Sequence, residues 1–384
     1  MRIAQVAPYY HPHLGGVESH VETISEELAR RGHDVHVVTS HLEDTPLQEE
    51  RHGVTIHRVP QLFNLFTTPV TPRLEEALRK HGPYDLVHAH SPPPVTAWYS
   101  ARAARKLRTP HVLTYHCDLE IPSIVGPAVV GIFRRTLGRY TVNHSEALVA
   151  TTRSYAATSR ALWHRGDVAV IPNPVDPSRF SPNIKGDAIR RRHNVGDRPV
   201  ALFVGRLTHH KGVDDFVRAA QFTPANVVHL VVGGGPWDGH LQRMVKDLGV
   251  EGKVILAGKV DYHDLPRYYA AATMGVLPST SRLEAFGIAA LEAMATGRPV
   301  VLSRMPGMQE VIEDAETGLL AEPADPKDLA EKITRIALDP ELAASMGKRG
   351  RARILEGFTL ERVVDALEKV YEGVLTARGG AGRP

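Results

Sequence analysis

Two glutamates, Glu284 and Glu292, stand eight residues apart in a stretch that has the pattern of a single helix. At about 1.5 Å of rise per residue, roughly 12 Å of helix axis would separate them. The paired carboxylates of a retaining glycoside hydrolase are only about 5 Å apart, so this pair is too widely spaced for that chemistry. The spacing suits a long ligand that is held at two points.

The second glutamate stands in a largely apolar part of this stretch, close to Ile288, Leu291 and Met294. A carboxylate in such surroundings costs free energy unless it has a partner, and the hydroxyls of a diol are good partners for its oxygens. We therefore interpret Glu292 as a ligand for a diol, and the alternative is a solvated glutamate on an exposed stripe of helix.

Two cations, Arg206 and Lys211, occupy a loop that opens with Gly205 and joins a predicted strand at 199–205 to a predicted helix at 213–220. Arginine offers a planar fork of donors and lysine a point charge, and together they can hold a diphosphate. A further glycine-rich turn at 233–236 contains Gly234 and follows the predicted strand at 227–233.

A third glycine-containing loop lies near the start of the chain, where Gly15 and Gly16 precede a predicted helix at 18–31. Adjacent glycines there allow backbone amides to approach an anion at the positive end of the helix. The dinucleotide pattern G-x-G-x-x-G is absent, and a tight turn with no ligand is the alternative interpretation.

These residues must be positioned by parallel sheets. The helix predicted at 285–296 lies between buried strands at 274–278 and 299–303, so its N-terminus opens onto the carboxyl edge of a sheet, where ligands bind in open α/β folds. A first series of strands is predicted at 3–7, 34–39, 54–59, 84–90, 110–116, 147–151 and 168–172. Two α/β halves with a ligand cleft between them follow from this arrangement.

The composition agrees with two domains, since 384 residues with 42% hydrophobic and 23% charged residues are long for a single core. We place the first domain at 1–175 and the second at 176–357. The proline-containing, charged stretch 174–198 has the composition of a linker. Three helices are predicted near the end of the chain, the last of them at 360–375, and residues 377–384 are predicted to be a disordered tail.

Several classes of function are excluded or disfavoured. A net charge of +3 does not indicate nucleic acid, and the single cysteine, Cys117, excludes a disulfide framework and fits a reducing compartment. The chain begins directly with a strand and has no apolar run of about 20 residues, so we expect no signal peptide and a cytoplasmic location. The histidines, among them His11, His13, His88 and His90, show no metal-ligand spacing, and we predict no metal site.

The segment 128–140 has a basic amphipathic pattern. Val129, Ile132 and Phe133 fall at helical spacing, with Arg134 and Arg135 beside them. Such a helix can lie on an anionic membrane surface, which would make the protein peripheral at the inner face of the membrane. The alternative is a helix that packs on its own sheet and exposes a solvated basic face.

The spacing from Glu284 to Glu292 resembles the E-x7-E motif of retaining glycosyltransferases of the GT-B fold. Residues 205–212, 233–236 and 171–176 are similar to the other signatures of glycosyltransferase family 4, and the resemblance covers essentially the whole chain. The resemblance implies two Rossmann-like doubly wound domains that face each other across a cleft, with a C-terminal helix at about 358–376 completing the first. Pro174 departs from the family pattern, which commonly has glycine there, and we expect it to stiffen the hinge.

The resemblance also implies roles for individual residues. Arg206 and Lys211 would hold the donor diphosphate and stabilise its charge as it leaves. Glu292 would accept the ribose hydroxyls, and His116 would contact the sugar. The transferred sugar would be gripped at the start of the helix by Glu284 and by the backbone amides of Ala285, Phe286 and Gly287. The remaining donor-binding positions are Gly15, Gly16, Gly205, Gly234 and, lining the base, Val260.

The expected activity is transfer of a hexose, mannose or glucose, from a nucleotide-diphosphate sugar to a lipid-linked, glycan or small polyol acceptor. The resemblance implies front-face transfer with retention and no requirement for a metal or other cofactor. Three alternatives stay open at this point. They are a sugar-nucleotide epimerase of the same fold, a phosphorylase, which would need a pyridoxal phosphate lysine and a longer chain, and a nucleotide-sugar binder without turnover.

Overall fold

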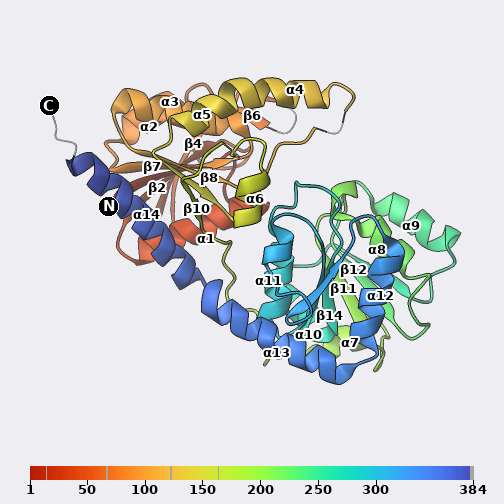
Figure 1. Ribbon diagram of the computed structural model, residues 1–384. Coiled ribbons are helices and arrows are strands. Elements are labelled where there is room, and N and C mark those ends of the chain that lie inside the picture. Colours follow the sequence, from red (N-terminus) through yellow and green to blue (C-terminus); the bar gives the residue numbers. More distant parts are fainter. Residues whose placement is uncertain (14, 66–67, 122, 163, 381–384) are drawn as a thin grey trace. The chain divides into compact units, whose positions relative to one another are not determined.

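The computed structural model describes residues 1–384 apart from 14, 66–67, 122, 163 and 381–384, and only the backbone of 379–380 (Figure 1). The chain forms two compact units. Unit 1 comprises Met1–Asn173 together with Leu360–Pro384, and unit 2 comprises Pro174–Thr359. The boundaries that we predicted from the sequence lie within a few residues of these.

The described part of unit 1 contains an eight-stranded sheet in the order β10-β9-β8-β7-β1-β2-β4-β3, together with the short hairpin β5–β6. All neighbours in the large sheet are parallel except β3 and β4, which pair antiparallel at one edge. The strands are β1 (Arg2–Val6), β2 (Asp34–Ser40), β3 (Gln48–Arg51), β4 (Val54–Val59), β5 (Phe63–Leu65), β6 (Thr68–Val70), β7 (Leu86–Ser91), β8 (His111–Tyr115), β9 (Ala147–Ala150) and β10 (Val168–Val170).

Helices cover both faces of this sheet, which is why its central strand β7 is buried along its whole length. Apolar residues of α1 and α14 pack on one face, and those of α2, α3 and α5 pack on the other (Figure 1). The helices of unit 1 are α1 (Gly16–Arg30), α2 (Leu74–His81), α3 (Pro94–Leu107), α4 (Gly126–Phe133), the π-helical turn η1 (Arg134–Gly138), α5 (Arg139–Asn143), α6 (Arg153–Thr158) and α14 (Leu360–Gly380).

Unit 2 contains a six-stranded parallel sheet in the order β13-β12-β11-β14-β15-β16. The chain builds outward from β11 in one direction and then returns to add β14 on its other side, so the strand order reverses between β11 and β14. The strands are β11 (Val200–Val204), β12 (Val228–Val232), β13 (Val254–Gly258), β14 (Met274–Leu277), β15 (Val300–Ser303) and β16 (Gly318–Ala321).

The helices of unit 2 also cover both faces of their sheet, with one apolar core on each side. They are α7 (Asp187–Arg192), the 3-10 turn η2 (His209–Lys211), α8 (Val213–Ala219), α9 (Asp238–Asp247), α10 (Leu265–Ala271), α11 (Ile288–Ala295), the 3-10 turn η3 (Met308–Glu310), α12 (Pro326–Ala337) and α13 (Pro340–Gly357). Both units therefore have the doubly wound α/β architecture that the sequence predicted.

Two expectations about the ends of the units are corrected. The stretch 174–198 is not a linker, because Phe180, Ile189 and Val195 are buried in the core of unit 2. The predicted tail is also helical as far as Gly380, since α14 continues beyond 375. Arg378 holds this end of the helix by donating hydrogen bonds to the Arg108 carbonyl and the Glu146 carboxylate. Residues 381–384 of the predicted tail lie outside the described part of the chain.

Candidate functional site

The carboxyl edge of the unit 2 sheet brings a cation and an acid together. Lys211 ends η2, which follows β11, and Glu284 lies in the loop that follows β14. These two strands are neighbours, and the strand order reverses between them, so their loops meet at the point where open α/β sheets bind ligands. The Lys211 ammonium forms an ion pair with the Glu284 carboxylate, and both side chains are half-buried.

The other predicted cation of this loop, Arg206, is exposed. Within the described part of the chain its guanidinium makes no hydrogen bond or ion pair. A guanidinium without a protein partner at a sheet edge has all its donors available for an anionic ligand. The loop after β11 therefore carries one cation balanced by Glu284 and a second that is unbalanced by the protein.

Glycines allow the loops at this edge to touch each other. Gly212 has a φ of +64°, and a Cβ added there would lie 1.9 Å from the Pro278 carbonyl oxygen. A Cβ on Gly233 would lie 1.8 Å from the carbonyl oxygen of Gly205, in the neighbouring loop. Real Cβ atoms cannot approach so closely, so these two positions require glycine for packing alone.

Gly205 and Gly234 differ from these two glycines. A Cβ on either would make only ordinary contacts of 3.5 Å or more, and neither has a positive φ. Among the residues that the structure describes, no contact explains why these positions have no side chain. An open backbone beside Arg206 leaves room for a ligand to approach the main chain closely.

The start of α11 differs from the prediction. Gly287 has a φ of +87°, so the helix begins at Ile288 rather than at 285. Glu284 therefore lies in a loop, and the expected separation of about 12 Å along one helix axis does not apply. The backbone amides of Ala285, Phe286 and Gly287 donate no hydrogen bond to the described residues. Unused amides before a helix N-terminus form a natural site for hydroxyl oxygens or anions.

The predicted diol ligand, Glu292, lies on α11 and is 8% exposed. The hydroxyl of Tyr269, on α10, donates a hydrogen bond of 2.6 Å to its Oε2. Burial raises the pKa of Glu292 to about 7, and the Tyr269 hydrogen bond and the positive charge of Arg179 offset part of that rise. Within the described ranges the carboxylate thus has one hydrogen-bond partner, and it keeps lone pairs that can accept further hydrogen bonds.

Val260, predicted to line the base, follows β13 and is half-buried against the core of unit 2. Beside it Tyr262 is exposed, and the Arg179 guanidinium lies 3.6 Å from the centre of its ring. Arg179 also donates a hydrogen bond of 2.6 Å to the Tyr262 carbonyl oxygen. This segment therefore offers a flat aromatic surface with a fixed positive charge on it.

In unit 1, Gly15 precedes α1 and Gly16 begins it. The first turn of α1 carries an acidic residue, Glu18. Its carboxylate lies directly beside Gly15, where an added Cβ would be only 2.2 Å from Oε2. Burial raises the pKa of Glu18, and His13 lies 3.5 Å from its other carboxylate oxygen. A carboxylate at this position opposes a second anion and can accept hydrogen bonds from sugar hydroxyls.

His116 follows β8 at the carboxyl edge of the unit 1 sheet and belongs to a cluster of buried imidazoles. Ring nitrogens of His20, His90 and His116 all lie within 4.8 Å of one another, a grouping compatible with a metal ion. The sequence spacing gave no sign of this grouping, since the three residues come from different elements. His90 uses both ring nitrogens in hydrogen bonds, to His116 and to Gln5, each of 3.0 Å.

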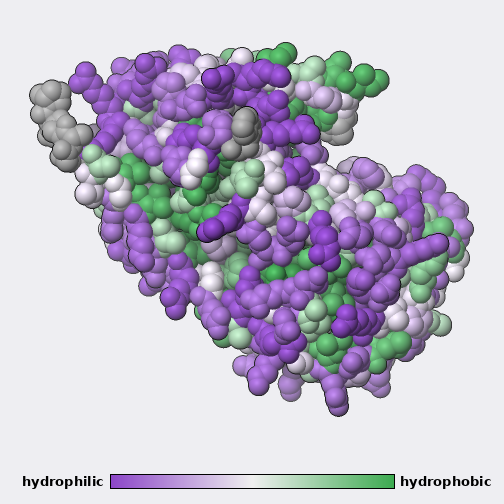
Figure 2. Space-filling view, viewed as in Figure 1, coloured by the Kyte–Doolittle hydropathy of each residue, from purple (hydrophilic) through white to green (hydrophobic). Residues whose placement is uncertain are grey.

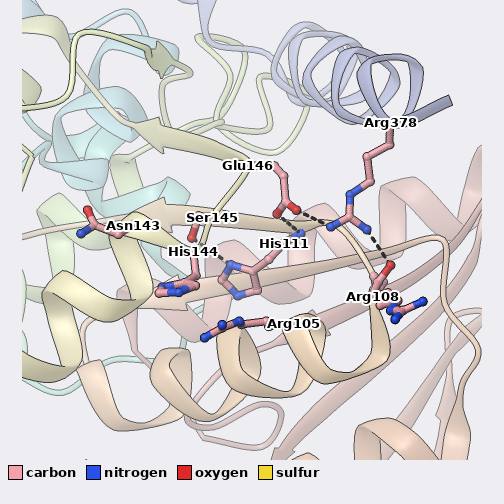
Figure 3. A pocket seen from close by; sticks show the side chains of 9 residues that line it. Arg105, Arg108, His111, Asn143, His144, Ser145, Glu146 and Arg378 are labelled. Atoms are coloured by element: carbon pink, nitrogen blue, oxygen red, sulfur yellow. Dashed lines mark hydrogen bonds and ion pairs between the residues drawn. The ribbon is translucent and has the colours of Figure 1, made fainter. Parts of the chain in front are cut away.

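A cavity of about 320 Å³ lies elsewhere in unit 1 (Figure 3). It is found where β8 and β9 begin, because His111 starts β8 and Glu146 directly precedes β9. The loops that carry Gly15 and His116 follow the carboxyl ends of parallel strands, so this cavity is at the opposite edge of the sheet. We do not assign it to the candidate site. It is lined by Arg105, Arg108, Thr109, His111, Asn143, His144, Ser145, Glu146 and Arg378.

The basic segment predicted at 128–140 is helical throughout, from α4 through η1 into α5. The second half packs against α3, whereas Gly126 is the only buried residue of α4. Ile124, Val125 and Ile132 are exposed, and Figure 2 shows hydrophobic side chains gathered at the α4 end of unit 1. No helix in the described ranges is long and apolar enough to cross a membrane.

Known families match this arrangement along most of the chain. The family model described as Glycosyltransferase Family 4 matches residues 14–179, and the model described as Glycosyl transferases group 1 matches residues 186–353. A D-inositol 3-phosphate glycosyltransferase of Acidothermus cellulolyticus is 31% identical over 98% of this chain and 91% of its own. The chain belongs to glycosyltransferase family 4.

Other relatives of this glycosyltransferase agree. A GDP-mannose-dependent alpha-(1-6)-phosphatidylinositol monomannoside mannosyltransferase of Mycolicibacterium smegmatis is 30% identical over 96% of this chain and 97% of its own. The structure of sucrose-phosphate synthase from Thermosynechococcus elongatus has a TM-score of 0.82 and 26% identity, covering 98% of this chain and 99% of that chain. Anabaena HepE, solved in complex with UDP, has a TM-score of 0.76 and 23% identity over 97% and 100% of the two chains, and shares the fold. The enzyme thus has the GT-B fold.

Sequence reasoning missed several residues around the predicted ones. Tyr269, which contacts Glu292, is one of several apolar or aromatic residues on α10, and nothing in its spacing singles it out. His90 was considered only as a metal ligand and set aside. A usable signal was the alternation of His88 and His90 along one strand, which places both side chains on one face of the sheet.

Proposed function

We propose that this glycosyltransferase moves a hexose, mannose or glucose, from a nucleotide-diphosphate sugar to a lipid-linked, glycan or small polyol acceptor. The observation that carries the proposal is the meeting of Lys211 and Glu284 at the point of unit 2 where the strand order reverses. A nucleotide diphosphate needs positive charge and amide donors, and a sugar needs hydrogen-bond acceptors. The loops after β11 and β14 offer both.

The donor would bind to unit 2 with its diphosphate at Arg206 and Lys211. The guanidinium without a protein partner and the open backbone at Gly205 and Gly234 support this placement, because both leave room for phosphate oxygens. Glu292 would accept the ribose hydroxyls, and Val260 would line the base. Glu284, with the unused amides of Ala285, Phe286 and Gly287, would hold the sugar.

The diphosphate of a nucleotide sugar carries one negative charge on each phosphate, and cleavage of the bond to the sugar adds one more on the terminal phosphate. Fixed cations that face this developing charge lower the barrier. We propose that Arg206 and Lys211 supply this charge, so that departure requires no divalent metal. We propose front-face transfer with retention of configuration, as the resemblance to family 4 implies, with Glu284 holding the sugar through hydrogen bonds. In unit 1, Gly15 and Gly16 would border the substrates, and His116 would contact the transferred sugar.

The acceptor and the location of the protein are proposals by analogy. The Mycolicibacterium relative is named for a phosphatidylinositol monomannoside acceptor. The exposed apolar residues of the α4 segment, followed by basic residues, suit an acceptor presented at a membrane. We propose that the enzyme acts in the cytoplasm, peripherally at the inner face of the membrane.

The first experiment is a screen of nucleotide sugars for thermal stabilisation, because a ligand that binds the native state raises the unfolding temperature. UDP-glucose, GDP-mannose and the matching free sugars are the probes. Incubation of the stabilising donor with inositol phosphate, phosphatidylinositol and polyol acceptors in the presence of EDTA then tests transfer, and the anomeric configuration of the product tests retention. Donor stabilisation without acceptor-dependent product would refute transfer, and EDTA inhibition would refute metal independence.

The raised pKa of Glu292 predicts proton release on donor binding. If ribose hydroxyls donate to its carboxylate, binding favours the ionised form, so near pH 6 the enzyme will release protons and the donor will bind more tightly as the pH rises to 8. Calorimetry in buffers of different ionisation enthalpy measures this release. Glu292→Gln is the matched control because it keeps the shape and cannot titrate. Equal proton release in both proteins would contradict the assignment.

The same group sets a stability trend. Its folded pKa, about 7, lies above the ordinary value of 4.5, so the folded state of the free enzyme holds the proton more tightly. This contribution is fully present below about pH 4.5 and is lost as the pH rises through about 7. The wild type should therefore lose stability relative to Glu292→Gln across that window.

We predict that the α4 segment, which comprises residues 124–140 from the loop before α4 into α5, binds anionic vesicles. Phosphatidylglycerol vesicles at low salt should retain the protein, and phosphatidylcholine vesicles should not. Charge reversal of both Arg134 and Arg135 to glutamate should release it. The matched control reverses Arg191 and Arg192, an exposed pair at the end of α7 in unit 2. Retention of the Arg134/Arg135 variant, or release of the control, would leave the segment with a structural role only.

A further inference from the structure

A row of buried polar side chains crosses the unit 1 sheet under α1 and α14. Gln5 on β1 stands opposite His88 on β7, and His90 on β7 stands opposite Thr114 on β8. Registered neighbours on parallel strands point to the same face, so these four side chains share one surface. His116 continues the alternation one step beyond Thr114. All of these residues are less than 10% exposed.

Hydrogen bonds join the row into one chain through a tyrosine of the last helix. His116 Nε2 lies 3.0 Å from His90 Nδ1, and His90 Nε2 lies 3.0 Å from Gln5 Oε1. The Gln5 amide nitrogen donates a bond of 3.2 Å to the Tyr371 hydroxyl. That hydroxyl lies 2.6 Å from His88 Nδ1, and His88 Nε2 lies 2.8 Å from Thr114 Oγ1.

The orientation of Gln5 fixes the direction of every link toward the sheet edge. Its amide nitrogen points to Tyr371, so its carbonyl oxygen points to His90 and must accept a hydrogen bond from His90 Nε2–H. A neutral imidazole has one donor and one acceptor, so His90 Nδ1 must then accept from Nε2–H of His116. The other nitrogen of His116, Nδ1, is left with its lone pair.

The hydrogen-bond chain requires neutral imidazoles. A protonated ring would carry two donors and break the alternation of donor and acceptor nitrogens. Burial supplies this condition, because it lowers the pKa of His88, His90 and His116 well below the ordinary value. The exposed fraction of the side chains in this row is largest at the end formed by His116. His90 is fully buried, whereas His116 keeps 9% of its surface exposed at the carboxyl edge of the sheet.

We propose that Gln5, His90 and Tyr371 are positioning residues that hold His116 as the Nε2–H tautomer, so that its Nδ1 accepts a hydrogen bond from a hydroxyl of the sugar substrate. The tautomer follows from unit 1 alone, and the sugar contact rests on the proposed function. His116 thereby selects ligands that present a hydroxyl as donor. A sugar in which fluorine replaces that hydroxyl can no longer donate and loses the contact.

The test is nitrogen NMR of the full chain labelled with ¹⁵N-histidine, because two-bond proton correlations distinguish the two tautomers of each ring. The expected wild-type spectrum shows His116 protonated at Nε2 and bare at Nδ1. Protonation at Nδ1 instead would mean that the hydrogen bonds from His116 through His90 to Gln5 are donated in the opposite direction. That result would overturn the proposal. This result needs neither substrate nor turnover, so it is independent of whether the proposed transfer is found.

Tyr371→Phe tests the positioning role. Without the hydroxyl the Gln5 amide loses the acceptor that orients it, so His116 should become a mixture of tautomers, and kcat/KM should fall about fivefold to tenfold, the worth of one neutral hydrogen bond. Tyr84→Phe is the matched control, since it also deletes a buried hydroxyl from unit 1, but Tyr84 takes no part in the hydrogen-bond chain. An unchanged His116 signal in Tyr371→Phe would refute the positioning role. If Tyr371→Phe does not fold, Gln5→Leu tests the same role, because it removes the carbonyl oxygen that accepts from His90. The His116 signal should again become a mixture of tautomers, and the wild-type spectrum still tests the tautomer itself.

The sugar contact has its own readout. Adding the stabilising nucleotide sugar to the labelled wild type should shift the Nδ1 signal of His116 toward that of a hydrogen-bonded acceptor. Singly fluorinated versions of the donor identify the hydroxyl, since one of them should leave Nδ1 unshifted. A donor that binds, as judged by thermal stabilisation, and leaves Nδ1 unchanged would refute the contact while the tautomer assignment stands.

Discussion

Replacing Lys211 with alanine is expected to lower kcat for sugar transfer by about 100-fold or more, which is the scale of losing one charge-stabilising donor. The ammonium is half-buried at the edge of the unit 2 sheet and is held in place by its ion pair with Glu284. A cation fixed in advance stabilises a departing diphosphate without having to reorganise. Initial rates at saturating donor measure the effect.

The matched control is Lys246→Ala, which removes an exposed lysine from α9 in the same unit. It should leave kcat unchanged. Thermal unfolding of both variants separates catalysis from folding, since Lys211→Ala also leaves the Glu284 carboxylate without its partner. A Lys211→Ala enzyme with wild-type kcat and wild-type affinity for the nucleoside diphosphate would remove this lysine from the site.

Replacing Gly212 with alanine should destabilise the enzyme by about 2–5 kcal/mol. The added Cβ would lie 1.9 Å from the Pro278 carbonyl oxygen, and the φ of +64° is unfavourable for any side chain. Overpacking typically costs about 1–3 kcal/mol and a left-handed residue about 1–2 kcal/mol. Because Gly212 and Pro278 join the loops that carry Lys211 and Glu284, donor affinity should fall as well. Urea unfolding and calorimetric titration measure the two effects.

Gly249→Ala separates the two causes. Gly249 has the same φ of +64°, but nothing lies within 4 Å of a Cβ added there. It should therefore show only the backbone cost and keep full donor affinity. If both variants lose the same stability, the contact between the two loops does not constrain position 212, and the packing argument fails.

Much of the fold could be predicted because parallel strands covered on both faces are continuous apolar runs. The strands predicted at 274–278 and 299–303, for example, lie at Met274–Leu277 and Val300–Ser303 in the structure. The start of α11 was misplaced because Ala285 and Phe286 are as apolar as the helix that follows. The apolar pattern continues through them, and only the left-handed Gly287 marks the true beginning.

The candidate site was predictable where one loop carries the signal, and not where partners come from distant elements. Lys211 and Glu284 were each identified from the sequence of their own loop. The sequence of neither loop shows that β11 and β14 are neighbours in the sheet, which is what brings the two residues together. The hydrogen bond between Tyr269 and Glu292 depends on how α10 packs on α11. Gln5 and Tyr371 lie 366 residues apart and meet only because the last helix returns to unit 1.

That return has a consequence for biosynthesis. Val363, Val364 and Leu367 of α14 complete the apolar core on one face of the first sheet, and Arg31 binds Asp365 and Glu368 of the same helix, each at 2.6 Å. Unit 2 is one continuous stretch and can finish folding as soon as it leaves the ribosome. Unit 1 begins to be synthesised first, but one face of its sheet stays uncovered until α14 has been made. A polypeptide that ends before α14 therefore exposes an apolar surface that is prone to aggregation.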